Sequence, residues 1–199
     1  RRSSDLGPSA LIGIQAVLIG LAIGLILGIL AAWKHNSVID YFTMILAVLG
    51  VSVPNFVAAA LLQYYIGLKW GVLPVGFWTG WNCSVLPSIA LSFSATAMVA
   101  RFMRTEMLDV LDQDYIVTAR AKGLSQMKVL MRHAVRNSIL PVVTILGPIV
   151  VNLMTGSLAV ENIFSIPGIG SLFVDCIKAN DYPVIMGITI FYAAFYMLV

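Results

Sequence analysis

Two long runs without a charged residue most constrain what this chain can fold into. Ser9–Trp33 contains 25 such positions and Tyr41–Leu68 contains 28. A helix rises about 1.5 Å per residue, so each run is longer than the roughly 30 Å of hydrocarbon in a bilayer. Hydrophobic residues make up 60% of the 199 positions, and a soluble fold of this size cannot bury so much apolar surface. The sequence therefore predicts an all-α integral membrane protein.

The same criterion predicts five spans within one transmembrane domain that covers residues 1–199. They lie at about 9–33, 41–68, 85–102, 139–160 and 182–199, and the connection 103–138 stays outside the lipid. The first five residues, RRSSD, contain neither an initiating methionine nor a signal peptide, and the chain ends within an apolar run. We therefore expect a fragment of a longer protein.

Basic residues predict the orientation of these spans, because they are enriched in cytoplasmic loops. The loops at 34–40 and 101–138 hold eight of the twelve: Lys34, Arg101, Arg104, Arg120, Lys122, Lys128, Arg132 and Arg136. The opposite side holds Arg1, Arg2, Lys69 and Lys178. The connection 103–138 is therefore predicted to be cytoplasmic, and the tryptophan-rich loop at 69–84 to lie at the outer interface.

The second run is interrupted by Gly50 and Pro54. Proline removes one helical hydrogen bond, so this span must kink. Broken helices with polar neighbours often line a cavity, which makes Ser52, Asn55 and Gln63 candidates for a translocation path. A purely structural kink is the alternative.

Glycines in the first run recur at intervals of four or seven, at Gly13, Gly20, Gly24 and Gly28. A stripe of small residues lets another helix approach closely. The alternative is that these glycines reflect only the usual composition of membrane helices.

Several kinds of chemistry have no residues to support them. A GxxxxGK[ST] phosphate loop, a metal-ligand cluster and a nucleophile–base pair are all missing, so we predict no catalysis, no metal and no cofactor in this chain. No carboxylate or basic residue is predicted within a span, which disfavours an ion-coupled carrier. His35 and His133 are expected to be solvated. Cys83 and Cys176 are both predicted to lie outside, where free thiols are favoured over a disulfide.

The connection 109–141 is the long polar passage of the chain, yet its apolar residues follow the spacing of one helical face: Val117, Ala121, Leu124, Met131 and Val135. Asp112–Asp114 suits the first turn of a helix, where carboxylates favour the positive end of the dipole. Gly123 fits the left-handed position after its end, and Ser125 can cap a second helix from Gln126 to about Asn137. Pro141 would then begin the next span. Such an elbow predicts either a docking element or a solvated loop against lipid headgroups.

Several separated motifs resemble those of a known family. Residues 118–123 (TARAKG), followed by 139–141 (ILP), resemble the EAA loop of bacterial ABC-importer permeases. Residues 111–116 (LDQDYI), 50–56 (GVSVPNF), 160–170 (VENIFSIPGIG) and 181–183 (DYP) resemble the oligopeptide/dipeptide branch of that family. Thr118 stands where the general motif has Glu, and the interval from glycine to proline is longer than in sugar permeases.

The resemblance implies a type I ABC-importer permease fold in a bacterial inner membrane. It also implies that the complete protein has a further N-terminal span, a larger external loop and a C-terminal cytoplasmic tail. Its implied partners are a second homologous permease subunit, two cytoplasmic ABC ATPases, an extracellular peptide-binding protein and membrane lipid, with no nucleic acid. The implied ATPase-coupling residues are Thr118, Ala119, Arg120, Ala121, Lys122, Gly123 and Leu124. For Arg120 and Lys122 the role is electrostatic support or, alternatively, headgroup contact.

The outer loop or gate would contain Glu161, Pro167, Gly168 and Gly170, although Glu161 could equally be a solvated charge. The implied function is ATP-driven import of dipeptides or oligopeptides. Import of nickel or glutathione on the same scaffold is the alternative. A self-sufficient carrier or channel is disfavoured, and an intramembrane enzyme or scaffold has no residue in its support.

Overall fold

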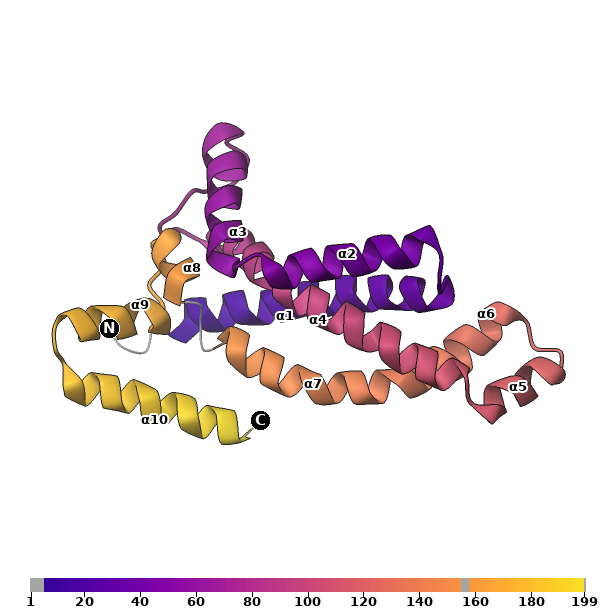
Figure 1. Ribbon diagram of the computed structural model, residues 1–199. Helices are drawn as coiled ribbons and strands as arrows, with labels where there is room; N and C mark the ends of the chain where they lie inside the picture. Colours follow the sequence, from indigo (N-terminus) through magenta and orange to yellow (C-terminus); the bar gives the residue numbers. More distant parts are fainter. Residues whose placement is uncertain (1–5, 155–157, 199) are drawn as a thin grey trace. The chain divides into compact units, whose positions relative to one another are not determined.

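The computed structural model describes residues 6–154 and 158–198, which form helices joined by short connections (Figure 1). The α-helices are α1 Leu6–Trp33, α2 Val38–Ser52, α3 Asn55–Leu62, α4 Val85–Leu111, α5 Asp114–Ala121, α6 Gln126–Val129, α7 Arg136–Met154, α8 Leu158–Ile163, α9 Ile169–Lys178 and α10 Tyr182–Leu198. Two wider π-helical segments, η1 Gln63–Lys69 and η3 Leu130–Val135, and one 3₁₀ turn, η2 Trp81–Ser84, complete them. Arg1, Arg2 and Val199 lie outside the described residues.

Three helical stretches are long and apolar enough to cross a bilayer: Gly7–Trp33, Trp81–Leu111 and Gln126–Leu153. The pair Val38–Ser52 and Asn55–Lys69 would make a fourth if both belong to one broken span. Tyr182–Leu198 is a shorter apolar helix over nearly all of the last predicted span. In the described residues, length and composition thus support several of the predicted spans, and the exact limits of each remain predictions.

Helices continue further into the polar connection than we predicted. α4 runs to Leu111, beyond the predicted limit of the span 85–102. The second helix of the elbow does not stop near Asn137 before a separate span at 139, because α6, η3 and α7 form one continuous stretch. The physical reason is that a helix satisfies its own backbone hydrogen bonds, so a change from apolar to charged side chains does not end it. Pro141 therefore lies within α7 rather than at its start.

The predicted loop 161–181 also contains a helix, α9. Its apolar residues follow the i, i+3, i+4, i+7 spacing of an amphipathic helix, at Ile169, Leu172, Phe173, Cys176 and Ile177. The signal was present in the sequence, but the proline and glycines around its start obscured it. α7 is described as far as Met154, and residues 155–157 of the fourth predicted span lie outside the described residues.

The described chain divides into two compact units. The first contains residues 6–19, 53–93, 147–154 and 158–198, and the second contains residues 20–52 and 94–146. Each unit is built from segments distant in sequence, because α1, α4 and α7 each contribute one part to both.

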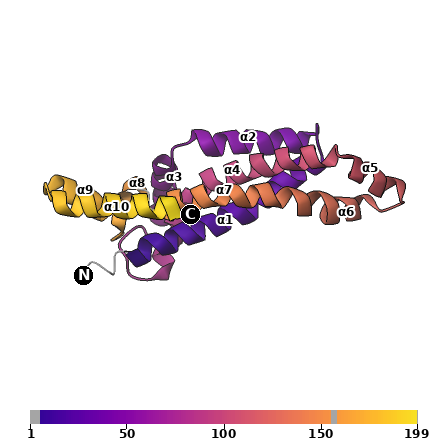
Figure 2. The same cartoon turned by 90° about the horizontal axis from the view of Figure 1, so that it is seen from below.

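In the second unit, the glycine stripe of α1 packs directly against α4. A Cβ added at Gly20 would lie 2.6 Å from the Cβ of Ala95, and one added at Gly24 would lie 2.8 Å from the Cβ of Val99. At Gly28 an added Cβ would lie 2.7 Å from the carbonyl oxygen of Ala100. The glycines therefore permit a backbone approach that larger residues prevent, which confirms the packing interpretation for these three positions. Figure 2 shows the two helices from a second direction.

In the first unit, polar side chains hold the helices together. Ser84 and Ser88 donate hydrogen bonds to Oε1 of Gln15, at 2.8 and 2.9 Å. The backbone N–H of Phe77, in the connection between η1 and η2, donates to the carbonyl of Phe164 at 2.9 Å. The two serine bonds join α1 to η2 and to the start of α4. The bond from Phe77 joins the connection between η1 and η2 to the end of α8.

Candidate functional site

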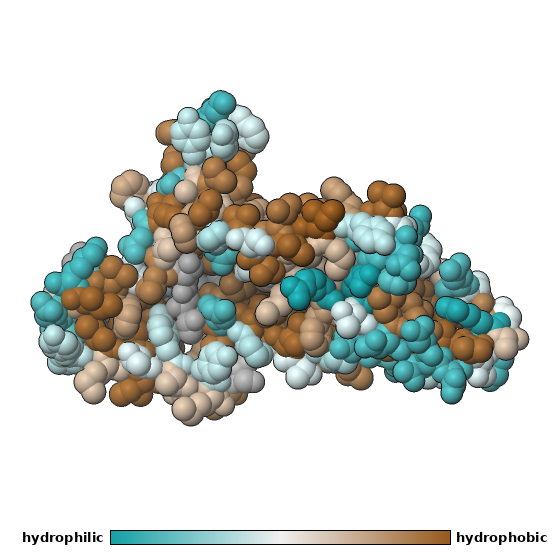
Figure 3. All heavy atoms as spheres, in the orientation of Figure 1, coloured by the Kyte–Doolittle hydropathy of each residue, from teal (hydrophilic) through white to brown (hydrophobic). Residues whose placement is uncertain are grey.

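The elbow, residues 114–135, leaves α4 through a short turn and is the hydrophilic end of the second unit (Figure 3). Its first helix, α5, ends in a Schellman motif. The N–H of Leu124 donates to the carbonyl of Ala119 at 3.4 Å, and the N–H of Gly123 donates to the carbonyl of Arg120 at 2.9 Å. Gly123 has φ +77°, the left-handed conformation that this motif requires and that glycine adopts without a Cβ clash. The prediction that Gly123 ends this helix in a left-handed conformation is confirmed.

The second helix of the elbow begins where the sequence predicts. Ser125 occupies the N-cap position of α6 with extended backbone angles, although its hydroxyl makes no capping hydrogen bond. Gln113 holds the same position before α5, also without a side-chain cap, and Asp114 lies in the first turn. Cap position is therefore set by the backbone here, and the carboxylate of Asp114 acts through the helix dipole.

The elbow has a small hydrophobic core of its own. Ile116, Ala119 and Val129 are buried, and Val110, Leu111 and Leu124 pack against them. Asn137 donates to the phenol oxygen of Tyr115 at 3.1 Å, which ties the start of α7 to α5. Ala119 is thus enclosed by this chain itself. It holds the two arms of the elbow together rather than forming part of the exposed face.

The other predicted coupling residues remain accessible. Thr118, Arg120, Ala121, Lys122 and Gly123 are exposed, and Leu124 is half-buried. The apolar stripe continues on this surface, with side chains 59% exposed at Val117 and 53% exposed at Met131. The elbow therefore presents apolar and basic side chains outward from a rigid Gly-centred turn.

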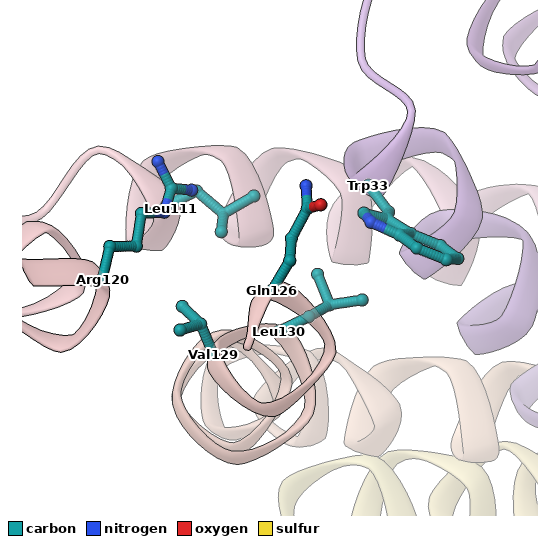
Figure 4. A pocket seen from close by; sticks show the side chains of 6 residues that line it. All are labelled: Trp33, Leu111, Arg120, Gln126, Val129 and Leu130. Atoms are coloured by element: carbon teal, nitrogen blue, oxygen red, sulfur yellow. The ribbon is translucent and has the colours of Figure 1, made fainter. Parts of the chain in front are cut away.

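A hollow of about 50 Å³ lies on the inner side of the elbow (Figure 4). Its lining comes from α1, α4, α5, α6 and η3: Trp33, Leu111, Arg120, Gln126, Val129 and Leu130. Gln126 extends between Arg120 and Trp33 in this view. The volume suits a few waters or one small polar group, and is too small for a peptide.

An ion pair that sequence reasoning missed joins α2 to α4. Asp40 is 1% exposed, and Arg104 binds it through two parallel hydrogen bonds, Nε to Oδ1 at 2.6 Å and Nη2 to Oδ2 at 2.8 Å. The backbone N–H of Asn36 also donates to Oδ2, at 3.1 Å. His35 is exposed, as predicted, and its Nδ1 lies 3.1 Å from Oδ2 of Asp40 and 3.2 Å from Nη2 of Arg104.

Both charged residues of this pair fall within long apolar helical stretches. Asp40 and Arg104 nevertheless lie just outside the predicted spans 41–68 and 85–102, so the absence of ionisable residues within a span stays a prediction. Hydropathy treats each charge as a penalty, whereas a carboxylate and a guanidinium facing each other compensate much of it. A signal was available: Asp40 directly precedes the second apolar run, in the first turn of α2, and Arg104 follows the third. Only the register of the two helices shows that they meet.

Glu161 is the centre of the second site, in the first unit. It is 3% exposed, so the alternative of a solvated charge is wrong. Ser9 donates from Oγ to Oε1 at 2.8 Å, and the N–H of Ser171 donates to Oε2 at 3.0 Å. The same Ser9 oxygen accepts the N–H of Ile169 at 3.0 Å. Burial raises the pKa of Glu161 above its ordinary value of 4.5, against these hydrogen bonds, which lower it.

The other residues of the predicted outer loop surround this carboxyl group. Gly168 is the N-cap of α9, and a Cβ at Gly168 would overlap the Glu161 carboxyl group. At Gly170 an added Cβ would lie 2.7 Å from Oε2. Pro167 is exposed. The glycines therefore make room for a buried carboxyl group at the start of α9, whose N–H groups face it.

The predicted kink is a complete break in the helix. α2 ends at Ser52, and α3 begins at Asn55 with Pro54 at its N-cap. The amide of Gln63 donates to the carbonyl oxygens of Val75 and Ile163, at 2.6 and 2.8 Å. Gln63 thus fastens η1 to the connection that follows it and to the end of α8, all in the first unit. The translocation path assigned to Ser52, Pro54, Asn55 and Gln63 remains a prediction.

Among the described residues, no group of His, Cys, Asp and Glu could hold a metal ion. Cys83 and Cys176 are both buried, and both are free thiols, as predicted.

Comparison with known proteins identifies the family. Residues 24–199 match the family described as the binding-protein-dependent transport system inner membrane component. The chain belongs to this family. It is therefore part of a multi-pass inner membrane component of a binding-protein-dependent transport system.

The relatives of this inner membrane component include two peptide permeases. The dipeptide transport system permease protein DppB of Bacillus subtilis is 48% identical over 184 residues, which cover 92% of this chain and 59% of that protein. The oligopeptide transport system permease protein OppB of Salmonella typhimurium is 41% identical over 190 residues, which cover 94% of this chain and 61% of that protein. The chain thus spans about three fifths of the length of these relatives.

Solved structures confirm the fold class. An amino acid ABC transporter with histidines matches with a TM-score of 0.74 at 20% identity, over 98% of this chain and 87% of that one. The MetNI methionine ABC transporter in an inward-facing conformation matches with a TM-score of 0.77 at 14% identity, over 98% and 89%. The chain has the all-helical fold of type I ABC-importer permeases.

Proposed function

We propose that this chain belongs to a permease subunit of an ATP-driven importer of short peptides. The observation that carries the proposal is the elbow: a Schellman turn at Gly123, fastened by its own core to the end of α4, with apolar and basic side chains facing outward. The named dipeptide and oligopeptide permeases, at 48% and 41% identity, support peptides as the cargo.

The proposed assembly has the partners that a binding-protein-dependent system requires. Two cytoplasmic ATPases would supply energy, a second homologous permease would complete the path, and an extracellular binding protein would deliver the peptide. The elbow would insert the exposed surface around Val117, Ala121 and Gly123 into a groove of one ATPase. Arg120 and Lys122 would add electrostatic attraction at its rim.

The outer loop would act on the opposite side of the membrane. Glu161, Gly168 and Gly170 lie at the junction of α1, α8 and α9, which makes this loop the proposed outer gate or contact for the binding protein. Because Glu161 is buried, its role would be to hold the loop in shape rather than to touch the partner.

Two alanines of the elbow allow a sharp test of docking. Ala121 is exposed and Ala119 is buried in the elbow core. Ala121→Trp should leave the folded protein intact but abolish ATP-dependent peptide uptake while the ATPases still hydrolyse ATP. Ala119→Trp should instead lower the stability of the elbow, because the core has no space for an indole. Full uptake by an assembled Ala121→Trp transporter would contradict docking at this surface.

Uptake itself is measured with the complete protein and its co-purified subunits in proteoliposomes. A labelled dipeptide should enter only when ATP and the binding protein are present. Competition by nickel or by glutathione, without competition by unlabelled peptides, would replace the peptide proposal with one of those cargoes. Uptake by the purified chain alone would instead favour a carrier or channel.

A further inference from the structure

We propose that Asp40 and Arg104 form the connection through which a displacement of the elbow reaches α2. This inference rests on the proposed function. It goes beyond docking, because it assigns the transmission of movement to one pair of side chains that lies away from the elbow surface.

The elbow and the end of α4 are built as one body. Val110 and Leu111, at the end of α4, pack against the elbow core of Ile116, Ala119 and Val129. Ser138, near the start of α7, donates to the carbonyl of Glu106 on α4 at 3.2 Å. From Arg104 to Leu111 the helix is uninterrupted, a distance of about 10 Å. A force on the elbow therefore moves Arg104 with it.

The attachment of α2 to this body depends strongly on the ion pair. Among the residues of α2, those that are buried are Asp40, Thr43 and Ala47, and the latter two are small. The large apolar side chains of α2 point outward, including Tyr41, Phe42 and Ile45. With so little apolar packing at its start, α2 is held there by the two charge-assisted hydrogen bonds from Arg104. Such a bidentate pair resists both sliding and rotation of one helix on the other.

The connecting turn before α2 belongs to the same node. Asn36 donates its N–H to Asp40, and Nδ1 of His35 lies between the carboxylate and the guanidinium. Movement of Arg104 is thus passed to the turn as well as to the helix. At its other end α2 stops at Ser52, beside the predicted translocation path.

The test uses the complete transporter and compares ATP hydrolysed per peptide imported. Arg104→Gln and Asp40→Asn each break the pair and should raise this ratio at least about fivefold, the lower end of couplings between distant sites. Arg104→Lys keeps the charge but loses the second hydrogen bond, so its ratio should lie between that of the unaltered protein and that of Arg104→Gln. Arg101→Gln is the matched control, because Arg101 is exposed one turn earlier on α4, and its ratio should not change.

A role in stability alone predicts a different result. Less assembled transporter would then lower ATP hydrolysis and uptake in proportion, and an unchanged ratio in Arg104→Gln would overturn the proposal. The double variant Asp40→Asn/Arg104→Gln should be no worse than either single one, since both remove the same connection. A double variant in which the two single increases in this ratio add together would also overturn the proposal.

A second measurement separates this inference from the proposed function. If the unaltered assembly imports no peptide, the proposed function fails, but hydrogen exchange still reports the connection. Binding of the cytoplasmic partner to the elbow should protect amides of residues 38–52 in the unaltered protein and in Arg101→Gln, and not in Arg104→Gln. Equal protection in all three proteins would overturn the connection whatever the cargo.

Discussion

Ser9 donates a 2.8 Å hydrogen bond to Glu161 across 152 residues of sequence. The same hydroxyl oxygen accepts the N–H of Ile169, so one serine near the start of α1 bridges α8 and α9. A carboxyl group buried at this junction must be satisfied locally, and it is, by Ser9 and by the N–H of Ser171. The loop is therefore held by directed hydrogen bonds rather than by apolar packing alone.

Stability should depend on pH through Glu161. Burial raises its pKa above 4.5, so the folded protein binds this proton more tightly than the unfolded chain. The resulting stabilisation is complete below about pH 4.5 and is lost as the pH rises through the higher folded value. The free energy of unfolding of the complete protein in detergent, measured across this window, should fall with pH.

The matched variants decide whether Glu161 is responsible. Glu161→Gln keeps the shape of the side chain and should remove that part of the pH dependence. Asp175→Asn alters an exposed carboxylate on α9 and should leave the dependence unchanged. Equal pH profiles for Glu161→Gln and the unaltered protein would contradict the assignment.

Replacement of Gly123 should weaken the elbow through backbone strain. An added Cβ at Gly123 meets nothing within 4 Å, but φ is +77°, so Gly123→Ala should destabilise the elbow by about 1–2 kcal/mol. Faster hydrogen exchange at residues 114–129 would report it. Gly187, in α10, also has open space around it but no positive φ. Gly187→Ala should therefore be neutral or slightly stabilising, and a similar loss at both sites would argue against strain as the cause.

A residue larger than glycine at position 24 should not fit between α1 and α4, because the two helices already pack closely there. An added Cβ there would lie 2.9 Å from the carbonyl oxygen of Thr96 and 2.8 Å from the Cβ of Val99. Gly24→Ala should cost about 1–3 kcal/mol, the usual range for an overpacked contact. Thermal unfolding in detergent measures the effect. Gly7→Ala, on the same helix with nothing within 4 Å, is the control and should leave the unfolding temperature unchanged.

The amide of Gln63 should be needed to hold the connection 70–80. It donates to Val75 and Ile163, and Gln63→Glu would replace the donor with an acceptor facing two carbonyl oxygens. We expect a loss of about 1–3 kcal/mol for the unpaired polar groups, seen as faster proteolysis within residues 70–80. Gln126→Glu, in the elbow, should not alter that rate. Unchanged proteolysis of Gln63→Glu would mean that the two bonds do not restrain the connection.

Patterns local in sequence predicted much of the fold. Apolar length predicted the membrane class, and the position of Gly123 predicted the end of α5. Gly20, Gly24 and Gly28 predicted a close helix contact, because a spacing of four keeps small residues on one helical face. Each of these depends on the chain's own geometry over one or a few turns, which the order of residues determines.

Helix limits were less predictable. Charged residues after position 102 indicated the end of a span, yet α4 continues to Leu111. Composition reports the preferred solvent of a segment, whereas its hydrogen bonds decide how far the helix extends. For the same reason α6, η3 and α7 run on past the predicted limit near Asn137.

By itself, the sequence determined that this is a helical membrane protein with a Gly-centred elbow, because period, length and turn chemistry are properties of neighbouring residues. Only the tertiary structure decided which distant side chains meet. It buried Ala119 inside the elbow, paired Asp40 with Arg104, and placed Ser9 against Glu161. Such contacts depend on the register between helices, and register is set by packing of the whole chain rather than by any local pattern.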